Sequence, residues 1–208
     1  LNLTVEQITT CIEEVGIGFM FAPAHHSAMR FAGPIRKDLG VPTIFNLLGP
    51  LTNPAGAKSQ LIGVPNKDLT LKIAQVLQRL GSSRVLVVHG HDGLCELTVT
   101  APTHVAELRD GKIREYDVNP EELGFKTGSL DEIRIDSPEE SAKIIERIFS
   151  CQEQGTARDI ALVNAAGAIV VAGIADDLKE AVELATETVD SGKAAEKMTQ
   201  LINFTQPV

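Results

Sequence analysis

QLIGVPNKDLTLKIAQVLQRLGSSRVLVVHG, residues 60–90, contains the pattern that predicts the fold class of this 208-residue chain. Residues 60–64 form a short apolar strand ended by a proline, and residues 84–90 form a continuous apolar run, typical of a strand buried on both faces. Strand, helix and strand in this order predict a parallel β-α-β unit. Residues 67–80 have helical spacing between an Asn66 cap and Gly81, and their expected buried stripe is Leu69, Ile73, Val76, Leu77 and Leu80.

The remaining elements predict a sheet with helices packed on it. Residues 103–118 contain two alternating runs joined by Asp110-Gly111, a favoured hairpin turn, so the sheet should be mixed. We predict an α/β fold, with a mixed, mostly parallel sheet flanked by helices, in a single domain over residues 1–208. Helices are expected at 4–15, where Thr4 and Gln7 suit a capping box, and at 138–149, 158–174, 177–190 and 193–203.

Composition narrows the class of protein. Asp and Glu outnumber Lys and Arg 28 to 19, a net charge of -9, which argues against a nucleic-acid partner. No apolar run approaches the roughly 20 residues that span a bilayer, so no membrane partner is expected. Cys11, Cys95 and Cys151 suit neither a disulfide framework nor a CxxC metal clip, which favours a reducing, cytoplasmic location. The chain begins with Leu, so we expect a piece of a longer protein.

Residues 22–36, APAHHSAMRFAGPIR, are the first candidate site. An adjacent histidine pair by itself is more typical of a helix start, and Arg36 by itself is more typical of a solvated helix residue. The stretch nevertheless gathers flat, polarisable and cationic side chains that suit an aromatic carboxylate. These are Pro23, His26, Met29 and Arg36.

Residues 89–97, HGHDGLCEL, are the second candidate site, because ligands of open α/β sheets collect at the carboxyl ends of strands. Glu96 could supply an oxygen ligand to Mg²⁺, whereas Asp92 and the glycine after it could simply form a turn. Zinc bound by His89, His91 and Cys95 is disfavoured, since no fourth ligand is within sequence reach. Neither GxGxxG nor GxxxxGK[ST] occurs, so no standard phosphate loop is visible.

Two stretches together resemble the anthranilate phosphoribosyltransferase family. They are GIGFMFAPAHHSAMRFAGPIRKDLGVPTIFNLLGPLTNPAGAKSQLIGV and ARDIALVNAAGAIVVAG followed by LKEAVELATETVDSGKA, and the likeness runs over residues 5–203. LGPLTNP is shared with the related pyrimidine-nucleoside phosphorylases. FAPAHHSAMR with the arginine at 36 is specific to the anthranilate enzymes, so the narrower family is favoured.

The resemblance implies a fold, a reaction and a set of site residues. The family has a small helical domain joined to a larger α/β domain, and with Mg²⁺ it transfers the phosphoribosyl group of phosphoribosyl pyrophosphate (PRPP) to anthranilate in tryptophan biosynthesis. The resemblance implies a homodimer for the full-length protein and a segment at 24–40 that packs on the helical domain. It also implies that Pro23, His26, Met29 and Arg36 line the anthranilate path, with Arg36 at the carboxylate and Gly49 leaving room beside it.

Two departures from the family pattern affect these expectations. The family's Asp-Glu pair for Mg²⁺ corresponds here to Cys95-Glu96, so a soft thiol replaces one hard ligand and weaker Mg²⁺ binding is expected. The family's glycine-rich PRPP loop and its Lys-His-Gly-Asn segment precede the matching region, so this chain resembles the C-terminal portion and is expected to be inactive alone. Two alternatives stay open: a pyrimidine-nucleoside phosphorylase relative and a non-catalytic binding paralogue.

Overall fold

The computed structural model describes residues 3–21, 38, 40, 41, 43, 48, 49 and 51–206. The chain divides into two compact units. One comprises Leu1–Ala57 with Glu196–Val208, and the other comprises Lys58–Ala195. No helix in the described part of the chain is both long enough and apolar enough to cross a membrane.

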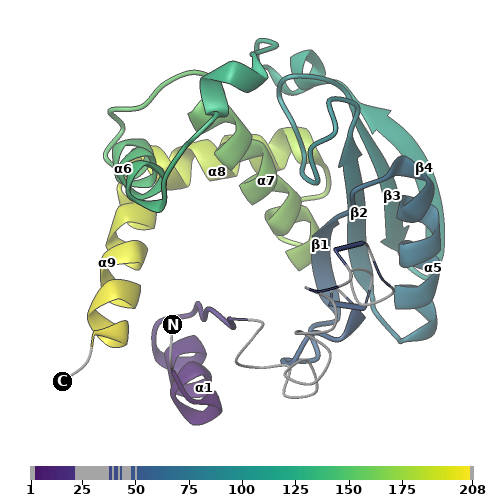
Figure 1. Cartoon of the computed structure of the whole chain (residues 1–208), viewed down its shortest axis with the longest axis horizontal. Helices are drawn as coiled ribbons and strands as arrows, with labels where there is room; N and C mark the ends of the chain where they lie inside the picture. The colour runs from purple at the N-terminus through teal and green to yellow at the C-terminus, as the bar shows by residue number, and fades with distance from the viewer. Residues whose placement is uncertain are drawn as a thin grey trace. The chain divides into compact units, whose positions relative to one another are not determined.

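The larger unit contains a four-stranded mixed sheet in the order β1-β2-β3-β4 (Figure 1). Its strands are β1 (Ser59–Gly63), β2 (Arg84–Gly90), β3 (Thr103–Arg109) and β4 (Lys112–Val118). β1 pairs with β2 in parallel, whereas β2 with β3 and β3 with β4 pair antiparallel. The mixed sheet is therefore confirmed, but the expected predominance of parallel pairs is wrong for the described strands, because only one connection is a helical crossover.

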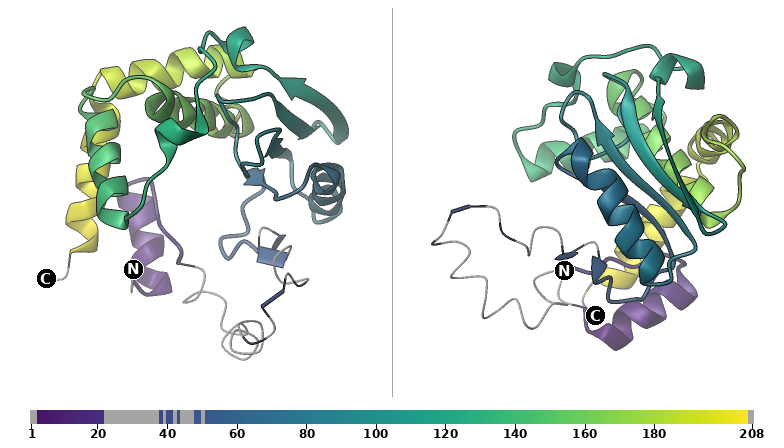
Figure 2. Two further views of the ribbon diagram at one scale, coloured as in Figure 1. Left: turned by 45° about the horizontal axis from the view of Figure 1, so that its top comes forward. Right: turned by 90° about the vertical axis from the view of Figure 1, so that its right-hand side faces the viewer.

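Helices cover both faces of this sheet. On one face lie η1 (Lys67–Leu69) and α5 (Thr70–Arg79), and on the opposite face lies α7 (Thr156–Ala172), as Figures 1 and 2 show. Leu86 and Val88 of β2 belong to the core that includes Val163 and Ala166 of α7. Because both of its faces are covered, β2 is buried along most of its length, as its continuous apolar sequence predicted.

The helix between the parallel strands differs in detail from its prediction. Ile73 and Leu77 are buried as expected, and Leu69 is half-buried. Val76 and Leu80, however, are 37% and 53% exposed, so the predicted apolar stripe is too wide. The sheet covers only the strip of α5 that faces it, and the flanks of this helix remain open to solvent.

The other helices lie close to their predicted positions. They are α6 (Pro138–Phe149), α8 (Leu178–Asp190) and α9 (Lys193–Thr205), with α7 displaced by two residues from its expected range. Ile148 of α6, Leu162 of α7 and Val189 of α8 pack in one apolar cluster. Two short 3₁₀ helices that the sequence reading missed, η2 (Pro120–Leu123) and η3 (Leu130–Ile133), connect β4 to α6.

The smaller unit joins segments from opposite ends of the sequence. Helix α1 (Val5–Glu14) begins with the predicted capping box between Thr4 and Gln7. The backbone carbonyl of Val15 accepts a 2.6 Å hydrogen bond from Lys197 Nζ, in the part of α9 that belongs to this unit. The segment 24–40, predicted to pack on a helical domain, lies almost entirely outside the described residues.

Candidate functional site

The chain forms a tight loop where it leaves the carboxyl end of β2, at residues 90–98. Asp92 Oδ1 accepts a 3.0 Å hydrogen bond from the backbone N–H of Leu94, and its Oδ2 accepts one of 2.6 Å from Thr98 Oγ1 and a further one from Thr100 Oγ1. Partial burial disfavours ionisation, but the bonds from Thr100, Thr98 and Leu94 together lower the pKa of the Asp92 carboxyl. Asp92 is therefore the residue that closes the loop, in line with its interpretation as a turn former.

Helix α7 and strand β1 also contact this loop. Asn164 Nδ2 donates a 2.8 Å hydrogen bond to the carbonyl of Leu97, and Asn164 Oδ1 accepts one of 3.1 Å from the Leu97 N–H. A Cβ placed on Gly63, the last residue of β1, would lie 1.5 Å from the carbonyl oxygen of Cys95. The loop thus packs directly on the sheet, and this approach requires glycine at position 63.

Cys95 and Glu96 are adjacent exposed residues of this loop, in which His91 and Gly93 are also exposed. The Cys95 thiol is free, and the described residues contain no group of three or more His, Cys, Asp or Glu side chains arranged to hold a metal ion. Mg²⁺ commonly binds through one or two carboxylates and completes its shell with water and substrate phosphates. Glu96 therefore suits a Mg²⁺ ion that is also held by a phosphate-bearing substrate, and does not suit a cage made of protein ligands alone.

The two histidines near this loop have separate partners. His89 Nδ1 lies 2.9 Å from the carbonyl oxygen of Val64. His91 Nε2 lies 3.6 Å from Asp117 Oδ2 on β4. The structure therefore gives no geometric support to a shared zinc site of His89, His91 and Cys95, which the sequence had already disfavoured.

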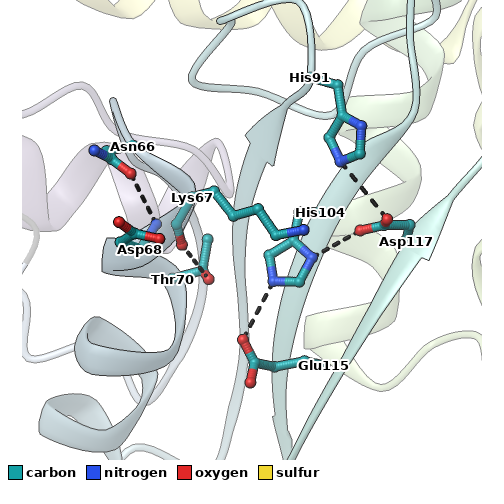
Figure 3. A network of polar contacts seen from close by, with 8 residues as sticks. All are labelled: Asn66, Lys67, Asp68, Thr70, His91, His104, Glu115 and Asp117. Carbon is teal, nitrogen blue, oxygen red and sulfur yellow. Dashed lines mark hydrogen bonds and ion pairs between the residues drawn. The ribbon is translucent and has the colours of Figure 1, made fainter.

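A polar network that the sequence reading missed lies on the β3–β4 hairpin (Figure 3). His104 is 7% exposed; its Nδ1 lies 2.7 Å from Asp117 Oδ1, and its Nε2 lies 3.2 Å from Glu115 Oε1. The hydrogen bond with His104 is the largest contribution that lowers the pKa of Asp117, and the positive charge of Lys67 adds to it. The sequence did contain a signal for this pair, because a two-residue turn at 110–111 places residue 104 opposite residue 117.

The predicted anthranilate residues fall mostly outside the described part of the chain. This applies to Pro23, His26, Met29 and Arg36, whose roles stay predictions. Gly49 is described and exposed, and a Cβ placed on it would meet no atom of the other described residues within 4 Å. Gly49 belongs to the smaller unit and Glu96 to the larger one, so the contacts of each residue are given only within its own unit.

Known proteins resemble both the sequence and the fold. An anthranilate phosphoribosyltransferase from Nitrosomonas eutropha is 52% identical over 204 residues, which cover 98% of this chain and 60% of that protein. The crystal structure of the enzyme of that name from Thermus thermophilus matches with a TM-score of 0.89 at 40% identity, over 95% of this chain and 58% of that one. The Saccharomyces cerevisiae enzyme in complex with PRPP and Mg has a TM-score of 0.88 at 26% identity, over 97% and 58% of the two chains.

The chain thus spans 60% of the length of the Nitrosomonas relative that it matches. The sequence model of one protein family, described as the glycosyl transferase family, a/b domain, matches residues 1–195. This match covers nearly the whole chain, including the β-α-β unit and the loop that carries Glu96. The chain therefore belongs to the glycosyl transferase family, as its a/b domain.

Proposed function

We propose that this chain supplies the α/β part of an enzyme that transfers the phosphoribosyl group of PRPP to anthranilate, in tryptophan biosynthesis. The observation that supports the proposal is the hydrogen-bonded loop that carries the exposed Glu96 at the carboxyl end of β2, since ligands of open α/β sheets collect at strand ends and Mg²⁺ binds carboxylates together with substrate phosphates. The names of the similar proteins, and the PRPP and Mg bound to the yeast enzyme, support the same reaction.

The reaction breaks the bond between C1 of the ribose and the pyrophosphate oxygen, and forms a bond from C1 to the anthranilate nitrogen, which loses a proton. Positive charge develops on the ribose, so positioning and electrostatics should carry most of the catalysis. Mg²⁺, when bound, neutralises charge on the departing pyrophosphate. Within this chain, Glu96 would hold one position of the ion, and the adjacent Cys95 thiol would be a poorer ligand than a carboxylate.

Anthranilate recognition is assigned to the smaller unit. Arg36 would hold the carboxylate through two parallel hydrogen bonds, which directs the amine toward the sugar. Pro23, His26 and Met29 would line the path of the aromatic ring, and the open space at Gly49 would leave room beside it. A cytoplasmic location, with its reducing conditions, is supported by the free thiols of Cys11, Cys95 and Cys151, and a homodimer is proposed for the longer enzyme.

The proposal is tested with a chimera in which this chain replaces the matching 60% of the Nitrosomonas eutropha relative. Anthranilate fluorescence should fall with time only when PRPP and Mg²⁺ are both present, and the loss should be much slower in an Arg36→Ala chimera. The isolated chain is assayed in parallel. A chimera that folds but consumes no anthranilate would contradict the proposal.

A non-catalytic binding role is the second candidate, and the thiol at position 95 is the observation that favours it. The chimera with Cys95→Asp separates the two functions. A clear gain in rate indicates an enzyme with a weakened metal site, whereas the absence of turnover in both forms favours a binding module.

A further inference from the structure

We propose that Asn164 is a positioning residue that fixes the backbone of the Glu96 loop, so that the Glu96 carboxylate meets the metal and phosphate of the substrate. The inference rests on the proposed function for its chemical consequence. Its geometric basis is independent of that function, because it concerns only contacts within the larger unit.

The side-chain amide of Asn164 binds Leu97 as a neighbouring β-strand would. It accepts a hydrogen bond of 3.1 Å from the Leu97 N–H and donates one of 2.8 Å to the Leu97 carbonyl. Leu97 is fully buried and lies outside the sheet, so its backbone groups have neither water nor a ladder partner to satisfy them. Asn164 therefore replaces a missing strand at the residue that directly follows Glu96.

The orientation of the Asn164 amide is itself determined. Its Nδ2 also donates a 2.8 Å hydrogen bond to the carbonyl of Ile160, one turn earlier in α7. Three residues further along the same helix, a Cβ on Gly167 would lie 2.7 Å from Leu97 Cδ1, so glycine there allows the helix to approach the loop. Both donors and the acceptor of the amide are thus used, and the alternative orientation would place like groups together.

The exposed pair Cys95-Glu96 consequently forms a short bridge between two residues whose backbone is hydrogen-bonded, Leu94 and Leu97. On one side, Asp92 Oδ1 holds the Leu94 N–H at 3.0 Å. On the other side, Asn164 holds both backbone groups of Leu97, and the next N–H, of Thr98, donates a 3.0 Å bond to Thr103 Oγ1. Because the backbone is held on both sides, the Glu96 carboxylate is positioned without a hydrogen bond from another described residue to its own side chain. A metal ligand requires a backbone that is fixed in this way.

The test uses the Asn164→Leu and Asn164→Ala variants of the chimera in which this chain replaces the matching 60% of the Nitrosomonas eutropha relative. Leucine has the same number and branching of side-chain heavy atoms as asparagine but removes every hydrogen bond. The smaller alanine side chain controls for overpacking by leucine. The control is Val171→Ala in the same helix. Val171 lines a small cavity with Arg84 and Arg109, near the start of β2 and away from the loop, so it reports the cost of weakening α7 alone.

Two quantities are measured on folded protein. Amide exchange followed by NMR should be roughly 10-fold faster at Leu97 in both Asn164 variants than in the wild type or the control. The affinity for Mn²⁺ in the presence of PRPP, measured by electron paramagnetic resonance, should fall by about 10–100-fold in the Asn164 variants and stay near wild type in the control.

Each outcome has a defined meaning. Unchanged exchange at Leu97 in folded Asn164 variants overturns the inference at its geometric basis. Faster exchange with unchanged Mn²⁺ affinity overturns the positioning role, as does an equal loss of affinity in Val171→Ala. A chimera with Asn164 unchanged that binds no Mn²⁺ with PRPP counts against the proposed function and removes the chemical part of the inference, whereas the exchange result still decides whether Asn164 holds the loop.

Discussion

His104 Nδ1 lies 2.7 Å from Asp117 Oδ1, across the antiparallel pair of β3 and β4. The imidazole is largely buried, whereas the carboxylate is partly exposed. Glu115, His91 and Lys67 surround the same pair, so two carboxylates face one buried imidazole, an exposed imidazole and an ammonium group (Figure 3).

This relationship predicts how acid affects stability. The pKa of Asp117 is lowered in the folded chain, chiefly by the hydrogen bond with His104, so the unfolded chain binds this proton more readily. The stabilisation is present above the unfolded pKa of about 3.9 and is lost as the pH falls through the lower folded value. Asp117→Asn should therefore flatten the acid side of the stability curve.

Urea unfolding between neutral pH and pH 3 measures this effect. The loss at neutral pH should be about 1 kcal/mol or less, because the carboxylate is partly solvent-screened. Asp136→Asn, which removes the same charge at an exposed position, is the control. If both variants shift the acid limb equally, the His104 contact contributes nothing specific.

Gly63 and Gly49 make a matched pair of glycine substitutions. A Cβ on Gly63 would lie 1.5 Å from the Cys95 carbonyl oxygen, so Gly63→Ala must displace either the loop or the end of β1. We expect a destabilisation of about 1–3 kcal/mol, measured by thermal or urea unfolding. Gly49→Ala meets no atom within 4 Å in the described part of the chain and should leave stability near wild type while weakening anthranilate binding. A fully stable Gly63→Ala variant would contradict the close packing of the loop on β1.

Substitutions at Cys95 and Glu96 should change metal affinity in opposite directions. Cys95→Asp adds a hard oxygen ligand beside Glu96 and should tighten Mg²⁺ or Mn²⁺ binding in the presence of PRPP by about tenfold or more. Glu96→Gln removes the charged oxygen and should weaken it by a similar factor. Cys95→Ser serves as the control, since it replaces the thiol without adding a charge. An equal gain in Cys95→Ser and Cys95→Asp would rule out a ligand effect.

Arg36 should discriminate anthranilate from analogues that lack the carboxylate. Arg36→Ala loses a charge-assisted pair worth about 1.5–3 kcal/mol, so anthranilate affinity should fall by roughly 10–100-fold in the chimera. Aniline, which has the amine but no carboxylate, should be affected little. Lys37→Ala is the adjacent control, and a comparable loss there would indicate a general charge effect.

Most elements of the fold were predictable from the sequence. The apolar run at 84–90, the helical period at 67–80 and the Asp110-Gly111 turn each depend on residues a few positions apart. The structure confirms all three, with the helical segment divided into η1 and α5. The width of the buried face of α5 was not predictable, because it depends on how much of the helix the sheet covers. The short helices η2 and η3 were not predictable from the sequence, because such short turns carry little periodic signal.

The candidate site was predictable only in part. The position of Glu96 after a buried strand follows from the order of the elements and from the exposed polar residues between apolar ones. Asn164, in contrast, lies in a nearly continuous apolar helix, 67 residues away from the backbone groups that it binds. Nothing in its local sequence distinguishes a loop-binding amide from an ordinary helix asparagine.

The sequence by itself determined the main helices and strands, the hairpin register and the residue types at the strand end, because these depend on spacing between near neighbours. Only the tertiary structure decided that Gly63 packs against the Cys95 carbonyl and that Asn164 binds the backbone of Leu97. The physical reason is that a buried backbone group must find a hydrogen-bond partner wherever packing brings one within reach, and that distance is set by the approach of whole elements.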